Sequence, residues 1–244
     1  MAKYSDDVKK IFASFKQEKL CADLEANHEE IVKRRIEFVE YGNPDTLESK
    51  TRCKLNCELL SQALLHRADC LLVAVGAMLV AKNVYGLALI ARGYVEAVAV
   101  LGYFCNRADA LTKGNIDFNR FEKDIANGLL GAKHDLFSKA DAPVNIVTCV
   151  ERADKYLDAH LFGGEKKAML QDIYGWLSEF AHPNFCSNKS AFSLDRATGR
   201  MILRHEGELQ ESDFQLPGHM NVAASMFARL FDDFKKSYEA VLTG

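Results

Sequence analysis

The chain has 244 residues, of which 48% are hydrophobic and only four are prolines, a composition that excludes a disordered protein and allows a sizeable core. Its formal net charge is −3, which excludes the basic surface needed for tight, non-specific binding of nucleic acid. Seven cysteines, an odd number lying partly in apolar helical segments, and the lack of a signal-peptide pattern lead us to expect a reduced, cytoplasmic protein.

Two amphipathic helices are predicted before residue 45. Ser5 can cap the first, and Asp6 and Asp7 complement the positive end of its dipole. The second has an apolar stripe that continues to Phe38, and we expect Gly42-Asn43-Pro44 to end it. The apolar positions are Val8, Ile11, Phe12 and Phe15 in the first helix and Leu20, Leu24, Ile31 and Phe38 in the second.

The most apolar part of the chain runs from Leu71 to Cys105, and the rest is expected to pack around it. We predict a long helix over 46–81, polar in its first half and apolar in its second, that projects beyond the core and then enters it. A second apolar helix should follow a short connection near Asn83 and Gly86 and end near Cys105.

These two helices are predicted to be a buried helical hairpin and not membrane spans. A bilayer-spanning helix needs roughly 20 mostly apolar residues. The first apolar run, Cys70 to Ala81, is too short, and the second has Arg92 and Glu96 near its middle, where charge is costly in lipid. We therefore expect no membrane association.

Three further helices are predicted after a loop at 106–114. Their expected bounds are 116–137, 142–164 and 165–182. Val147 and Leu161 of the second should face inward, and Gly163-Gly164 should cap it. Pro183 should stop the third helix at His182.

The periodicity then changes from helical to alternating. Residues 191–194 and 201–204 flank a loop that contains Gly199, which predicts a β-hairpin inserted at about 190–205. A lone hairpin is marginal in water, so it should lie on the helical body or on another subunit. A last amphipathic helix is expected over 220–242. The sequence thus predicts one all-α domain over 1–244, a bundle of about seven helices around the buried central hairpin.

Arg92 and Glu96 are the two charged residues of the central helix between Lys82 and Arg107. They are four residues apart and share a helix face, but Arg before Glu is the weaker order for an isolated helix. A buried charge without a partner is costly, so both should be paired. The pair can be a structural ion pair or part of a functional site, and the sequence leaves both open.

One local group of polar residues could carry chemistry. Tyr174, Ser178 and His182 recur every four residues and share a helical stripe, with Glu179 beside them. His182 is predicted at the helix C-terminus, where it can serve as a cap or as a general acid or base. Asn184 can hydrogen-bond the His182 ring or the free carbonyls.

No cofactor or metal site is predicted. The chain has no phosphate-binding loop, dinucleotide fingerprint, zinc-protease or hydrolase motif. The pairs Cys53/Cys57 and His66/Cys70 have i, i+4 spacing, but on one helix they point to nearly opposite sides, and no CxxC is present.

The segment Leu177-Ser178-Glu179-Phe180-Ala181-His182-Pro183-Asn184, following an apolar helix that carries Arg92 and Glu96, resembles a group of uncharacterised bacterial all-helical proteins that look like the HEPN superfamily. The resemblance covers 84–184 and implies a helical bundle, often dimeric. Many members are metal-independent ribonucleases of defence systems. Their catalytic pattern places an arginine shortly before a histidine; His182 matches the histidine, but no arginine lies between Arg152 and His182.

The sequence is therefore compatible with two functions, and it leaves open whether the protein is an enzyme. The first is a cytoplasmic module that dimerises or binds a protein partner within a defence or mobile-element system, in which Arg92, Glu96 and His182 fix helix packing. Its contact surfaces would be the hairpin and the polar half of the 46–81 helix. The alternative is a ribonuclease acting on RNA, in which His182 is the general acid or base, Arg92 stabilises phosphate charge, Glu96 orients Arg92 and Asn184 orients His182.

Overall fold

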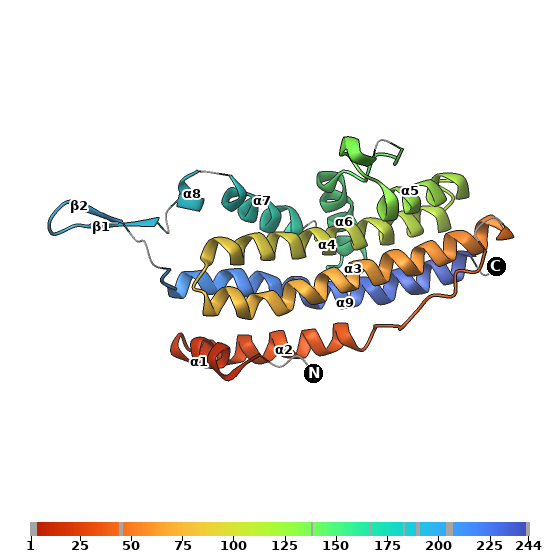
Figure 1. The fold of residues 1–244 in the computed structure, drawn as a ribbon. Coiled ribbons are helices and arrows are strands. Elements are labelled where there is room, and N and C mark those ends of the chain that lie inside the picture. The colour runs from red at the N-terminus through yellow and green to blue at the C-terminus, as the bar shows by residue number, and fades with distance from the viewer. Residues whose placement is uncertain are drawn as a thin grey trace.

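The computed structural model describes residues 4–43, 46–137, 139–165, 167–182, 184–188, 191–203 and 207–242. It confirms an all-α fold with a small antiparallel hairpin (Figure 1). These residues form eight α-helices of nine residues or more and one four-residue helix, where the sequence predicts about seven. The bounds are α1 Asp6–Ser14, α2 Glu18–Val32, α3 Ser49–Val80, α4 Val84–Thr112, α5 Phe118–Leu130, α6 Ile146–His160, α7 Met169–Ala181, α8 Phe185–Asn188, β1 Phe192–Asp195, β2 Arg200–Leu203 and α9 Gln215–Leu242.

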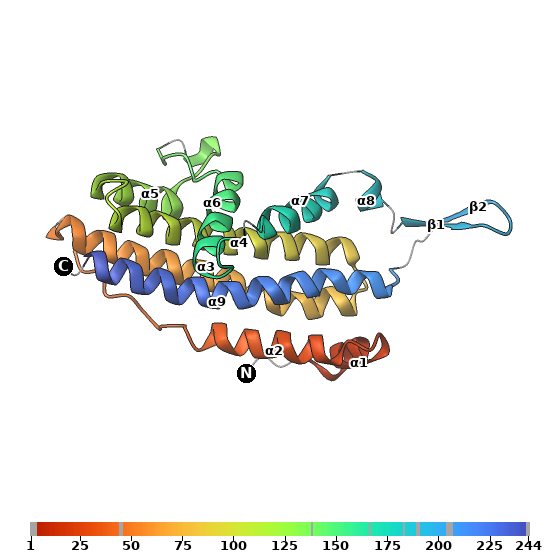
Figure 2. The same ribbon diagram turned by 180° about the vertical axis from the view of Figure 1, so that it is seen from behind.

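The helices form three layers. The long helices α3, α4 and α9 lie side by side in the middle (Figures 1 and 2). On one side α6 and α7 pack on α4, and α5 packs on α3 and α4; on the other side α1 and α2 pack against α3 and α9. One cluster of buried apolar side chains includes residues of all three layers.

The central helix α4 is buried as predicted, and it continues further than expected. Tyr94 and Phe104 are fully buried, and Gly102 allows α6 to approach so closely that a Cβ there would lie 2.6 Å from the Cβ of Ala153. The prediction that the helix ends near Cys105, with a loop at 106–114, is wrong, because α4 runs to Thr112. Arg107 stabilises this last part through an ion pair with Asp124 of α5.

The second helix is shorter than predicted. It ends at Val32, not at Gly42-Asn43-Pro44, and Phe38 is 69% exposed. The chain then crosses in an extended conformation to the start of α3 (Figure 1). Polar side chains of α3 bind this crossing segment: Gln62 Nε2 donates to the Arg34 carbonyl at 3.0 Å, and Tyr41 Oη donates to Asn56 Oδ1 at 2.6 Å.

The first half of α3 packs in the core, and the prediction that it projects beyond the core is wrong. Cys53 and Cys57 are fully buried and Leu60 nearly so. Glu58 accepts a hydrogen bond of 2.6 Å from the Tyr238 hydroxyl of α9. The polar residues of this half therefore bind neighbouring segments of the chain. From the sequence pattern alone, a polar helix face of this kind is expected to be exposed to solvent.

The bounds of α5 and α6 also differ from the prediction. The helix predicted over 116–137 ends at Leu130. Gly131 then packs against the backbone of Pro143, where a Cβ would lie 2.6 Å from the Pro143 Cα. The next helix starts at Ile146, capped by the Asn145 side chain, and not at Ala142-Pro143. Val147 and Leu161, expected to face inward, are 55% and 38% exposed.

The start of α7 is fixed by a residue from another helix. The helix was predicted from Glu165 but begins at Met169, and Ala168 at its N-cap offers no side-chain acceptor. The Asp154 carboxylate of α6 replaces that cap: it accepts hydrogen bonds from the backbone N–H groups of Leu170 at 2.9 Å and Gln171 at 3.0 Å. The helix ends at Ala181 near the predicted stop, and Pro183 lies outside the described residues.

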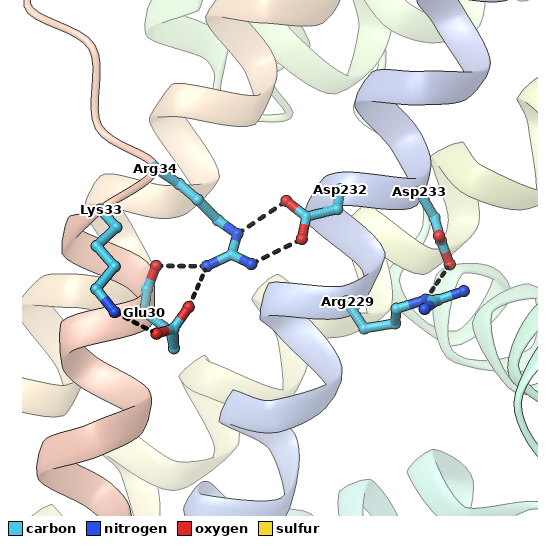
Figure 3. Close-up of polar contacts among 6 residues, drawn as sticks. All are labelled: Glu30, Lys33, Arg34, Arg229, Asp232 and Asp233. Atoms are coloured by element: carbon cyan, nitrogen blue, oxygen red, sulfur yellow. Dashed lines mark hydrogen bonds and ion pairs between the residues drawn. The ribbon is translucent and has the colours of Figure 1, made fainter.

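An ion-pair group joins the outer layer to the middle layer (Figure 3). Arg34, just after α2, donates to both carboxylate oxygens of Asp232 on α9 at 2.9 and 2.7 Å. It also donates to the Glu30 carbonyl at 2.6 Å. The hydrogen bond to Asp232 is the main cause of the raised pKa of Arg34. This bidentate contact fixes where α2 ends and how it lies on α9.

The β-hairpin forms as predicted and extends away from the helical body (Figures 1 and 2). Its strands pair Phe192 with Leu203 and Leu194 with Met201. The sequence placed the hairpin on the helical body or on another subunit; in the described chain the helical body leaves all of β2 exposed.

By length and composition, α3 and α4 would each be able to span a membrane, a test that core helices of soluble proteins also pass. Here α4 packs against α3, α5, α6, α7 and α9, and most of its apolar residues are buried within the fold.

Candidate functional site

The predicted polar residues lie mainly between α4 and α7. Arg92 Nη2 donates a hydrogen bond to the Tyr174 hydroxyl at 3.1 Å, and its guanidinium carbon lies 5.3 Å from the centre of the Tyr174 ring. The hydrogen bond to Tyr174 is the main cause of the raised pKa of Arg92. Tyr174 therefore holds the arginine by both its hydroxyl and its ring.

Glu96 lies between two arginines. Its carboxylate is 3.4 Å from Arg92 Nε and 3.5 Å from Arg67 Nη2 of α3. The expectation that Arg92 and Glu96 are both paired is confirmed, and the second partner of Glu96 comes from another helix. Their side chains are 26% and 27% exposed, so the network is partly open to solvent.

His182 and Asn184 lie at the far end of α7. His182 follows the helix in an extended conformation (φ −108°, ψ 144°) and is exposed. It is eight residues beyond Tyr174, roughly 12 Å along a helix axis. Among the described residues, no hydrogen bond or ion pair joins His182 to Arg92 or Glu96. The structure thus brings Arg92, Glu96 and Tyr174 together and leaves His182 apart from them.

The remaining predicted residues make local contacts. The Ser178 hydroxyl donates to the Tyr174 carbonyl at 2.7 Å, one turn back in the same helix. Asn184 Nδ2 donates to Glu179 Oε2 at 2.7 Å, where the sequence suggested a bond to the His182 ring or to free carbonyls. These contacts order the end of α7 around Asn184.

The partial exposure of the Arg92–Glu96 pair predicts a small effect of Glu96→Ala. We expect the free energy of unfolding to fall by about 1 kcal/mol or less, because partly exposed ion pairs are weak and Arg92 keeps its contact with Tyr174. Denaturant unfolding of wild type and variant measures the difference. A loss of about 3 kcal/mol or more, as for a buried pair, would contradict this expectation.

A second polar group, which the sequence analysis missed, joins α2 to α3. His28 is 6% exposed, and its Nε2 lies 2.6 Å from Asp69 Oδ1, while Arg35 forms an ion pair with the other oxygen of Asp69. The only signal in the sequence was that His28 lies within the apolar stripe of Leu24 and Ile31. A histidine in such a stripe indicates a hydrogen-bonded core residue as readily as a functional site.

His28 of this pair also lines a pocket of about 500 Å³ between α1, α2 and α3. Its walls are mostly apolar, and they include Tyr4, His28, Leu72 and Gly76. The Tyr94 hydroxyl is buried and has no hydrogen-bond partner among the described residues; burial raises its pKa, and Tyr4 and Asp69 add to the effect. An apolar pocket with few polar groups is the usual form of a small-molecule site.

Trp176, the one tryptophan of the chain, allows His219 to be followed by fluorescence. The two rings meet edge-on with centres 5.0 Å apart, and burial lowers the pKa of His219. The fluorescence should titrate with a midpoint below about 6.5, the ordinary histidine value. Because the unfolded chain binds the proton more readily, stability should fall as the pH drops below that value. The transition should vanish in His219→Gln; a midpoint at or above the ordinary value would contradict the expectation.

Comparison with known proteins found no relative of this chain: no protein-family model matches it, and searches of curated proteins and of solved structures give no match.

Proposed function

We propose that this protein is an interaction module that forms a homodimer through its β-hairpin. The observation that carries the proposal is the apolar face that the hairpin presents to solvent. Leu194, Met201 and Leu203 are 55%, 54% and 64% exposed, on an element that extends away from the helical body (Figure 1). A two-stranded hairpin is marginal alone, so an exposed apolar hairpin favours a partner that covers it.

The strand register shows that all four side chains of this face are apolar. Residues that pair across an antiparallel ladder share a face, and alternate residues of a strand share it too. Phe192 pairs with Leu203 and Leu194 with Met201, so these four side chains form one face, which we call the apolar hairpin face. The opposite face contains Ser193, Asp195, Arg200 and Ile202. A two-sided pattern of this kind is typical of a sheet with one covered face.

A second copy of the chain fits this face. The apolar hairpin face carries no charge, so two copies related by a two-fold axis can pack face to face without repulsion. A standard interface buries about 800 Å² on each partner, more than one short hairpin provides. The contact should therefore continue onto the near end of the bundle, where Val80, Tyr85 and Leu89 are also exposed.

The hairpin is tied to that end of the bundle. Gly207, after β2, packs so closely on the carbonyl of Lys82 in the α3–α4 connection that a Cβ there would collide with it. The hairpin face and the exposed residues at the ends of α3 and α4 are thereby kept near each other, as one interface requires.

Molar mass in solution tests the proposal. We expect wild type to be a dimer by light scattering and sedimentation, and Met201→Lys to be a monomer, because the lysine would place a charge within the apolar hairpin face. Ile202→Lys is the matched control: it is the next residue of the same strand, is similarly exposed at 51%, and points to the opposite face. A monomeric wild type, or equal loss of the dimer in both variants, would overturn the proposal.

The ribonuclease alternative has less support. It needs positive charge beside His182, whereas Arg92 is bound to Tyr174 and Glu96, and His182 lies at the far end of α7. The cytoplasmic location and a role in defence or mobile-element systems remain parts of the proposal that rest on cysteine usage and on the resemblance of residues 84–184.

A further inference from the structure

His66, Asp69 and Cys70 gather on one outward-facing side of α3. Their ligand atoms, one from each residue, all lie within 4.8 Å of one another. His66 and Cys70 are exposed, and Asp69 is partly buried. None of these residues belongs to the Arg92 network or to the hairpin, so the group is independent of the proposed dimer.

We propose that His66, Asp69 and Cys70 form a binding site for Zn²⁺. Imidazole, carboxylate and thiolate are the three side-chain ligand types that zinc uses, at distances of about 2.0–2.3 Å. In a tetrahedral site those bond lengths put a nitrogen and a sulfur ligand about 3.5 Å apart. Cys70 Sγ lies 3.7 Å from His66 Nε2, so this pair already has nearly the required separation.

The spacing on the helix explains why the three residues converge. Positions i, i+3 and i+4 lie on the same face of an α-helix, so His66, Asp69 and Cys70 point to the same side. Cys53 and Cys57 point to nearly the opposite side of the helix from His66 and Cys70, so they cannot complete a site with them. Asp69 lies on the same side as His66 and Cys70 and supplies the third ligand.

His28 would support the site from inside the fold. Its Nε2 hydrogen-bonds Asp69 Oδ1 at 2.6 Å and so orients the carboxylate, as outer-shell partners of metal ligands do. The other oxygen of Asp69 pairs with Arg35, whose side chain is 46% exposed and can move away. The metal would take the place of that positive charge.

Binding has a defined proton balance. The Cys70 thiol must lose its proton to solvent to become a thiolate ligand, and His66 must bind through a neutral ring nitrogen. The three side chains leave a fourth tetrahedral position for water, so the zinc should exchange readily and should not be needed for folding.

Metal titration of the full-length chain tests the site. Co²⁺ in place of Zn²⁺ should give visible bands of tetrahedral cobalt and a near-ultraviolet thiolate-to-cobalt band, and Zn²⁺ should abolish both. Competition with a chromophoric chelator then measures Zn²⁺ affinity. His66→Gln and Cys70→Ser should each remove the bands, and His28→Gln should weaken affinity about 10- to 100-fold. His134→Gln, an exposed histidine elsewhere, is the matched control and should bind as wild type does.

Two results would overturn the proposal. One is a wild-type protein that gives no cobalt bands and does not compete with the chelator. The other is binding that survives unchanged in both His66→Gln and Cys70→Ser, which would place the metal on other residues. Circular dichroism of each variant checks that the helical fold is kept, so a loss of binding reports on the ligands alone.

Discussion

Replacing Asp124 with alanine should lower the free energy of unfolding by about 3–5 kcal/mol, because it leaves the Arg107 guanidinium without its partner in a mostly buried place. Arg107 Nε and Nη2 lie 2.7 and 2.5 Å from the Asp124 carboxylate. The two side chains are only 15% and 5% exposed. The pair joins the last turns of α4 to α5, so its loss affects two helices. Chemical denaturation of wild type and variant measures the change.

Two matched variants separate the buried charge from the surface charge. Arg120 also contacts Asp124, at 3.2 Å, but is 62% exposed, so Arg120→Ala should cost about 1 kcal/mol or less. Replacing both partners, as in Arg107→Met with Asp124→Leu, should recover most of the stability lost in Asp124→Ala, since apolar pairs often substitute for buried ion pairs. Equal losses in Asp124→Ala and Arg120→Ala would show that burial does not set the effect.

Asp154→Ala should be the second most damaging of these substitutions, with a loss of about 2–3 kcal/mol of unfolding free energy. Asp154 is 2% exposed and caps α7 from the neighbouring helix through the Leu170 and Gln171 amides. Burial raises the pKa of its carboxyl, and the two amide bonds oppose that rise. The burial cost therefore offsets part of the gain from the cap. Alanine would leave the Leu170 amide buried without an acceptor.

The neighbouring Asp158 provides the control for Asp154. It lies on the same helix, and its carboxylate accepts a hydrogen bond from the backbone N–H of Lys167 at 2.8 Å in an exposed setting. Asp158→Ala should cost clearly less than Asp154→Ala when both are compared by thermal and denaturant unfolding. A loss of similar size in the two variants would mean that Asp154 does not act as the cap of α7.

The proposals on association and metal binding concern different surfaces. The hairpin and the exposed ends of α3 and α4 carry the proposed dimer, while the zinc ligands lie within α3 near the start of the α2–α3 crossing segment. Met201→Lys should therefore leave cobalt spectra unchanged, and Cys70→Ser should leave the molar mass unchanged.

The sequence by itself determined those features that depend on near neighbours in the chain. Ser5 caps α1, the stretch from Leu71 to Cys105 forms buried helices, and the alternation around Gly199 forms a hairpin, because caps, helical periodicity and strand alternation are local. The pairing of Arg92 with Glu96 was predictable for the same reason, since four residues separate them.

Only the tertiary structure decided the contacts between residues distant in the chain. His28 with Asp69, Arg107 with Asp124, and Asp154 with the start of α7 each involve partners on different helices. Sequence periodicity shows which face of a helix is polar, but the same polar face can meet water or another segment. The sequence therefore predicted wrongly that α3 projects from the core and that α2 runs past Val32. The polar residues of α3 bind the segment after α2 and the last helix, α9, and only packing brings these partners to α3.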